Sequence, residues 1–108
     1  MELWWFLQPF DEEQDMPTYV MLTNLSAEGV RTLKNNPGRV AEVNQEVEQI
    51  GAKVVAQYAT LGQYDFVTIV EAPDEKTMAK VSVELGSRGT MTSQTLAAMP
   101  ADELAGSL

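Results

Sequence analysis

The sequence contains no cysteine and no histidine among its 108 residues. Without cysteine the chain has no disulfide framework, no thiol nucleophile, and no thiolate ligands for zinc or an iron–sulfur cluster. Without histidine it lacks the commonest general base and the usual protein ligand of haem and transition metals. We therefore expect no metal and no cofactor, and the choice between enzyme and non-enzyme leans towards a non-enzyme.

Basic residues are also few. Seven Lys and Arg stand against 16 Asp and Glu, which gives a formal net charge of −9. Nucleic-acid binding needs a surplus of basic residues on one face, so we expect no nucleic-acid partner. The longest apolar run, residues 3–7, is far shorter than the roughly 20 residues of a membrane-spanning helix, and the N-terminus does not read as a signal peptide. We expect a cytoplasmic protein without membrane contact, with which the lack of cysteine agrees.

Residues 1–15 differ in composition from the rest of the chain. Residues 3–10 are rich in aromatic side chains, and residues 11–15 form an acidic spacer. Exposed aromatic surface of this size is typical of a docking segment, for which the candidate residues are Leu3, Trp4, Trp5, Phe6 and Phe10. The alternatives are packing within the protein's own oligomer, which we rank first, and an engineered leader. We divide the chain into an extension, residues 1–15, and one domain, residues 16–108.

The sequence of this domain predicts four strands and two helices. β-Branched and aromatic residues place the strands at residues 17–25, 52–60, 64–72 and 90–97. An apolar stripe predicts a first helix between residues 26 and 50, interrupted at residues 35–38 and restarting with Pro37 as its first residue. Asp74 predicts the start of a second helix over residues 75–85, and residues 100–104 a short helical turn.

The order βαββαβ predicts an α+β, ferredoxin-like fold in which both helices cover one face of a four-stranded antiparallel sheet. The third predicted strand carries apolar residues on both of its faces, Val67 and Ile69 on one and Phe66 and Val70 on the other. A sheet with one solvated face alternates apolar with polar residues, so a second layer should cover the open face. We expect that layer to be another copy of the chain.

The turn between the second and third strands holds Gly62, Tyr64 and Asp65. With its flanking residues, from Leu61 to Asp74, this turn resembles the GYD-domain family, and the resemblance extends over about residues 16–104. It implies a small ferredoxin-like protein that forms a dimeric α+β barrel through the open sheet face. It implies no settled biochemical activity.

The first candidate site is the turn itself. In a structural interpretation Gly62 adopts a positive φ, Asp65 bonds backbone amides, and the Tyr64 hydroxyl is held by a hydrogen bond. In a functional interpretation Tyr64 and Asp65 form the polar end of a pocket. Arg39 is a further candidate, because a guanidinium beside a helix start favours a carboxylate or phosphate. The alternative for Arg39 is a surface ion pair with Glu42 or Glu46.

Polar residues of the last strand form another candidate. Thr90, Thr92 and Gln94 alternate along it, and Tyr58 of the second strand is expected nearby, which together would suit a small-molecule pocket. The alternative is an edge strand wetted by solvent. Glu71, Asp74 and Glu75 lack the spacing of a calcium loop, so no metal site is expected.

These residues favour a homo-oligomeric module that binds a small molecule or another macromolecule. An alternative is a small oxygenase- or isomerase-like enzyme in the barrel cavity, with Asp65 as base and Tyr64 or Arg39 polarising an oxygen. A further alternative is a protein-docking component that acts through residues 3–10. The expected partners are a second copy of the chain, a small-molecule ligand and a protein bound through residues 1–10.

Overall fold

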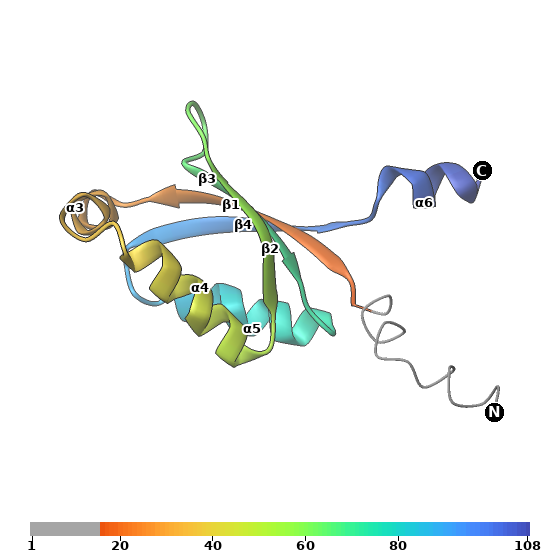
Figure 1. The fold of residues 1–108 in the computed structure, drawn as a ribbon, viewed down its shortest axis with the longest axis horizontal. Helices are drawn as coiled ribbons and strands as arrows, with labels where there is room; N and C mark the ends of the chain where they lie inside the picture. Colours follow the sequence, from red (N-terminus) through yellow and green to blue (C-terminus); the bar gives the residue numbers. More distant parts are fainter. Residues whose placement is uncertain (1–15) are drawn as a thin grey trace.

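The computed structural model of this chain describes residues 16–108 (Figure 1). Predictions for the aromatic segment, Leu3 to Phe10, lie outside the described residues. The elements, in chain order, are β1 (Thr18–Leu25), α3 (Ala27–Asn35), α4 (Arg39–Ile50), β2 (Lys53–Ala59), β3 (Phe66–Glu71), α5 (Glu75–Gly86), β4 (Met91–Ala98) and α6 (Ala101–Gly106). The order βαββαβ predicted from the sequence is therefore present, with the first helix in two parts and α6 after the last strand.

The strands form one four-stranded sheet in the order β2-β3-β1-β4. Every neighbouring pair is antiparallel. β1 lies inside the sheet between β3 and β4, while β2 and β4 are the edges. This confirms the predicted α+β class with a four-stranded antiparallel sheet.

The first predicted helix is divided into α3 and α4, as the Asn-Pro-Gly break indicates. Ser26 caps α3, since its hydroxyl accepts a hydrogen bond from the Gly29 amide at 3.1 Å. The prediction that Pro37 is the first residue of the second part is wrong by two residues. The Arg39 amide donates to the Asn36 carbonyl at 3.0 Å, so Pro37 lies in a turn and Gly38 takes the N-cap position of α4.

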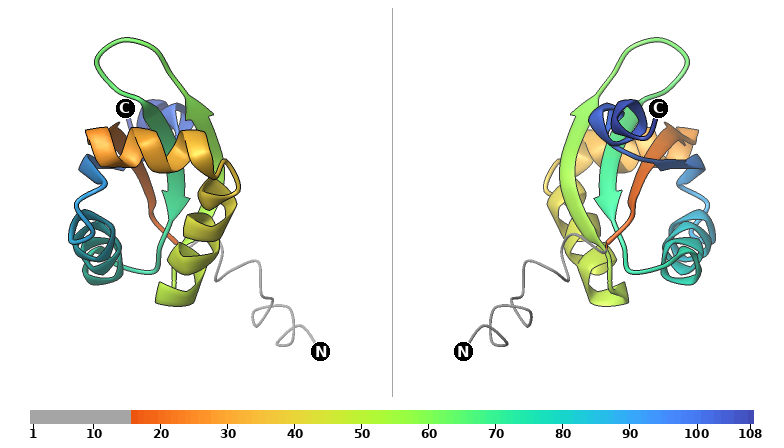
Figure 2. Two further views of the ribbon diagram at one scale, coloured as in Figure 1. Left: turned by 90° about the vertical axis from the view of Figure 1, so that its left-hand side faces the viewer. Right: turned by 90° about the vertical axis from the view of Figure 1, so that its right-hand side faces the viewer.

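The core lies between α4, α5 and one face of the sheet. β1 contributes Tyr19 and Met21 to this face, and α5 contributes Met78, Val81 and Leu85. Figure 1 shows α4 and α5 on the same side of the sheet, and the side views of Figure 2 agree. Burying a side chain such as Val81, which is fully buried, stabilises the fold by about 1.5–3 kcal/mol. We call this side of the sheet the helix-covered face.

No helix of residues 16–108 packs over the opposite side of the sheet (Figure 1). The strand register places Val20, Leu22, Val67, Ile69 and Leu96 on this side, which we call the open face. α6 extends beyond the end of β4, and all its residues are exposed. Within residues 16–108, no helix combines the length and the apolar composition required to cross a membrane.

Candidate functional site

The glycine–tyrosine–aspartate turn is fastened to the neighbouring strand. Gly62 has a φ of 104°, a conformation that favours glycine. The Asp65 carboxylate accepts a hydrogen bond from the Leu25 amide at 2.8 Å, and the Asp65 amide donates to the Thr23 carbonyl, also at 2.8 Å. The bond from the Leu25 amide is of the kind that the structural interpretation expects, because the Asp65 side chain accepts it from the backbone.

Tyr64 extends this arrangement onto the open face. Its hydroxyl donates a hydrogen bond to Oε1 of Gln94 at 3.1 Å. Gln94 lies opposite Leu22, which lies opposite Val67, and Val67 lies opposite Tyr58, so one row of side chains crosses the whole sheet. The structure thus places the predicted residues Tyr58, Tyr64, Thr92 and Gln94 on the same face.

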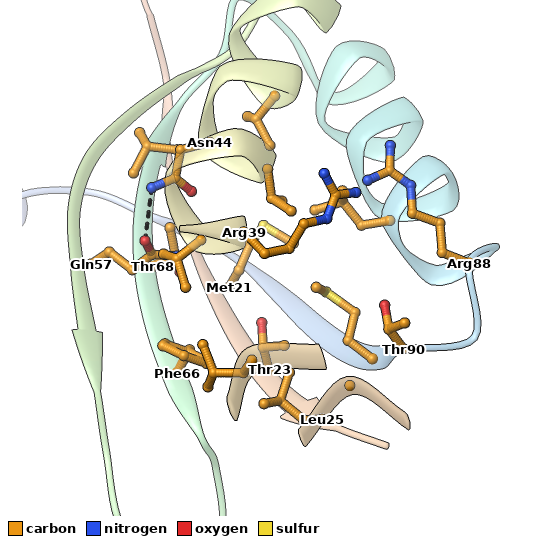
Figure 3. A pocket seen from close by; sticks show the side chains of 18 of the residues that line it. Met21, Thr23, Leu25, Arg39, Asn44, Gln57, Phe66, Thr68, Arg88 and Thr90 are labelled. Atoms are coloured by element: carbon orange, nitrogen blue, oxygen red, sulfur yellow. Dashed lines mark hydrogen bonds between the residues drawn. The ribbon is translucent and has the colours of Figure 1, made fainter. Parts of the chain in front are cut away.

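A cavity of about 190 Å³ lies on the other side of the sheet, between its helix-covered face and the helices (Figure 3). Its walls come from α3, α4, the end of α5 and the strands. Apolar side chains, including Met21, Val43, Val47, Val70 and Leu85, form most of the lining. A mainly apolar hollow with a few polar groups is the usual form of a small-molecule site.

A short chain of hydrogen bonds forms one wall of this cavity. Asn44 of α4 donates to Oε1 of Gln57 at 2.8 Å, and Gln57 donates to Oγ1 of Thr68 at 3.0 Å. Thr68 and its cavity-lining neighbour Thr23 are only 6% and 5% exposed. These groups bring polarity into the interior without bringing charge.

Two arginines lie at the opposite wall, where Figure 3 shows their guanidinium groups side by side. Arg39 begins α4, and Arg88 follows α5. Both donate to the Glu46 carboxylate, Arg39 at 3.2 Å and Arg88 at 2.5 Å. The hydrogen bond from Arg88, and then that from Arg39, holds the pKa of Glu46 below its ordinary value, although partial desolvation opposes this.

Each arginine has a further carboxylate partner. Arg39 bonds Glu42 at 3.1 Å, and Arg88 bonds Glu84 at 3.1 Å. The hydrogen bonds to Glu42 and Glu46 raise the pKa of Arg39, and the bond to Glu46 does most to raise that of Arg88. Both guanidiniums therefore stay charged. The ion pairs considered as the alternative for Arg39 are both present.

The structure separates the predicted site residues into two groups. Arg39 lines the cavity on the helix-covered face, together with Thr90. Tyr64 bonds Gln94 on the open face, and Asp65 is engaged at the Leu25 amide. Arg39 is thus not brought together with Tyr64 and Asp65.

Sequence reasoning did not identify Asn44, Gln57, Thr68 and Arg88 as cavity residues. A signal for Asn44 was available, since it follows Val40 by four residues and precedes Val47 by three, which puts it on the apolar stripe of its helix. Gln57 and Thr68 interrupt strand faces that are otherwise apolar. For Arg88 the sequence carries no comparable signal, because it lies in a loop.

The arrangement is suited to binding. Among residues 16–108 no three Asp or Glu side chains gather closely enough to hold a metal ion. Asp65, the predicted base, is not among the residues that line the cavity. An acid–base step needs a titratable group within reach of the substrate, and the charged residues lining this cavity are Arg39 and Arg88.

The chain belongs to the GYD-domain family. The GYD domain matches residues 19–108, which include nearly the whole of the sheet and all the helices described above. This confirms the resemblance carried by the glycine–tyrosine–aspartate turn.

Among characterised relatives, the chain is similar to the "Glutamine synthetase and cystathionine beta-lyase binding protein" of Thermus thermophilus. The two are 50% identical over 90 residues, which cover 82% of this chain and 95% of the relative.

Two solved structures share the fold. The crystal structure of MtbAldR superposes with a TM-score of 0.55 at 18% identity, over 78% of this chain and 52% of that one. The chain thus spans about half the length of MtbAldR. TTHA0845 from Thermus thermophilus gives a TM-score of 0.51 at 22% identity, over 79% of this chain and 95% of that one. At these identities the likeness concerns the fold alone.

Proposed function

We propose that this protein is a non-catalytic module that binds another protein, and that its partner is a metabolic enzyme. The observation that carries the proposal is the 50% identity to a relative named for binding glutamine synthetase and cystathionine β-lyase. The aligned region makes up 95% of that relative. A binding surface in the relative therefore falls almost wholly within the part that the two proteins share.

Binding to purified enzymes tests this proposal. The full chain is immobilised and exposed separately to glutamine synthetase, to cystathionine β-lyase and to serum albumin as the negative control, with biolayer interferometry as the readout. We expect saturable binding to at least one of the two enzymes and none to albumin. Absence of binding to both enzymes would overturn the proposed partner class.

The part of the chain that binds is a separate question. The family match begins at residue 19, so we propose that enzyme binding resides in the domain, residues 16–108. A chain lacking residues 1–15 should then bind the enzyme with unchanged affinity. Loss of binding in that variant would instead assign the docking role to the aromatic segment, Leu3 to Phe10.

We propose further that the module is a homodimer in which two ferredoxin-like domains stack their open faces into an α+β barrel. Apolar residues at the centre of this face support the proposal: Leu22 and Val67 lie in the row that crosses the sheet. Tyr58, at the end of the same row, is 62% exposed in the single chain. Apolar side chains gathered on an exposed face are typical of an interface. Tyr64, Gln94 and Thr92 would then line the space between the two sheets.

Light scattering coupled to size-exclusion chromatography checks the dimer. The expected mass is about twice the 11.9 kDa of one chain. Leu22→Glu puts a charge at the centre of the stacked sheets and should give monomers. Val83→Glu is the matched control, because Val83 is 70% exposed on α5, away from the open face. A monomeric wild-type chain, or a dimer that survives Leu22→Glu, would contradict this assembly.

Small-molecule binding is the second candidate function. The observation that favours it is the cavity on the helix-covered face, which combines an apolar interior with two arginines. The two functions are compatible, since the proposed dimer uses the other face of the sheet.

A further inference from the structure

We propose that the cavity beneath α3 and α4 binds a small carboxylate with an apolar body, and that Arg39 receives the carboxylate. This inference rests on the second candidate function, small-molecule binding, and is independent of the enzyme-binding proposal. It assigns a ligand class and an orientation: the apolar body inside, the charged group at the arginine wall.

The interior of the cavity suits an apolar body. Its volume of about 190 Å³ is far above the ~10–15 Å³ that one water molecule needs. The floor consists of the core residues Met21, Val70 and Leu85, and the helix side of Val43 and Val47. An apolar ligand gains free energy in proportion to the surface that it buries against such walls.

The hydrogen-bonded wall of the cavity does not favour binding of a charged ligand group. Asn44, Gln57 and Thr68 already bond one another. The two bonds use the amide oxygen and the amide nitrogen of Gln57, so this side chain has a partner at each end. A charged ligand group placed here would lose its hydration without gaining an opposite charge. The charged end of a ligand therefore belongs at the other wall.

At that wall the charged residues facing the cavity are Arg39 and Arg88. Glu42, Glu46 and Glu84, which bond the two guanidiniums, are not part of the lining. The lining therefore contains the two guanidiniums and none of the three carboxylates that pair with them. A ligand carboxylate at this wall would meet guanidinium N–H donors, which suit its oxygen atoms.

Arg39 retains hydrogen-bonding capacity for such a ligand. Both of its ion pairs use Nη1. A guanidinium also carries N–H groups on Nε and Nη2, and these form an edge that matches a carboxylate in a two-point contact. Among residues 16–108 no hydrogen bond engages this edge of Arg39. Arg88 uses both Nη1 and Nη2, so Arg39 is the better receptor.

The test uses 4-methylpentanoate as the probe and the full chain as the protein, with calorimetry and amide NMR shifts as readouts. Two matched compounds separate the contributions: 4-methylpentanamide keeps the shape without the charge, and acetate keeps the charge without the body. We expect the probe to bind about tenfold more tightly, or more, than either matched compound. The amide lacks the charged contact with the guanidinium, and acetate lacks the burial of an apolar body. The amide shifts should concentrate at Gly29, Thr68 and Val70.

Variants test the assigned arginine. Arg39→Gln should weaken probe binding about tenfold or more, and Arg39→Lys should recover only part of it, because lysine lacks the planar donor edge. Arg31→Gln is the matched control, an exposed arginine on α3 outside the lining. Glu46→Gln removes a competing carboxylate and should tighten binding severalfold, whereas the exposed Glu48→Gln should not.

Several results would overturn the inference. These are no binding of the probe, equal binding of the amide, shifts confined to open-face residues such as Thr92 and Gln94, or equal losses in Arg39→Gln and Arg31→Gln. Circular dichroism shows whether each variant is folded. If Arg39→Gln does not fold, the affinity of Arg39→Lys for the probe still decides the test. The enzyme-binding assay contains no carboxylate probe, so either proposal can fail alone.

Discussion

The carboxylate of Asp65 accepts a hydrogen bond from the backbone amide of Leu25, 40 residues earlier in the chain, at 2.8 Å. This bond joins the turn after β2 to the last residue of β1. The aspartate of the glycine–tyrosine–aspartate signature therefore acts in this structure as a partner for the backbone. Its effect should appear in stability measurements.

Asp65→Ala should destabilise the protein by about 1–3 kcal/mol, because the partly buried Leu25 amide loses a charged acceptor. Asp65→Asn keeps an amide oxygen as acceptor and should cost less. Urea unfolding of both variants measures the difference in the free energy of unfolding. Asp102→Ala in the exposed α6 is the control and should have little effect. Equal stability of Asp65→Ala and wild type would show that the bond contributes nothing.

Gly62→Ala should destabilise the turn by about 1–2 kcal/mol, because a side chain disfavours a positive φ. Crowding is not the cause, since no heavy atom outside the adjoining residues lies within 4 Å of the position that its Cβ would take. The neighbouring substitution Gln63→Ala tests for general sensitivity of the loop. Thermal melting of the two variants checks the prediction, which fails if both melt alike.

Gly29→Ala should be more harmful for a steric reason. A Cβ at this position would lie 2.1 Å from the Thr90 carbonyl oxygen, so α3 must move away from the start of β4. Forced overpacking of this kind costs about 1–3 kcal/mol. At Gly86, on α5, an added Cβ would have no atom of another element within 4 Å, so Gly86→Ala should be neutral or slightly stabilising. Comparable unfolding midpoints for the two variants would contradict the close approach.

Glu46 should make stability depend on pH in the acid range. The pKa of Glu46 lies below its ordinary value of 4.5 in the folded protein, because Arg88 and Arg39 favour the charged form. Its contribution to the free energy of unfolding is therefore fully present above about pH 4.5 and is lost as the pH falls through the lowered pKa. Glu46→Gln should be less stable than wild type at pH 7, and the gap should narrow at pH 3.

Urea unfolding at the two pH values measures this gap. Glu48→Gln, two residues further along α4 but exposed, serves as the control and should show no comparable change. A gap that stays constant between pH 7 and pH 3 would exclude the ionised Glu46 as its source.

Much of the fold could be predicted from the sequence because its signals are local. The Asn-Pro-Gly break between α3 and α4 and the turn at Gly62 each depend on a few neighbouring residues. The two-residue error at Pro37 arises from the same locality: the proline suits both a turn and a first helical turn, and the Arg39–Asn36 hydrogen bond decides between them.

The cavity could not be predicted in the same way, because its lining comes from segments far apart in the chain. Gln57 bonds Thr68 from the adjacent strand and Asn44 from α4, and only the folded chain brings the three together. Arg39 was identified for its charge near a helix start, but the neighbouring sequence does not indicate on which face of the sheet its side chain lies. Its pairing through Glu46 with Arg88, a loop residue, lies beyond sequence patterns.

The alternation of β1 has a practical consequence for genetics. Met21 and Thr23 face the cavity, whereas Val20 and Leu22, each one residue away, face the opposite side. Substitutions at adjacent codons therefore address two different surfaces, and separation-of-function alleles should be obtainable within a single strand. By the same geometry, a one-residue insertion in β1 would exchange the two surfaces and damage both at once.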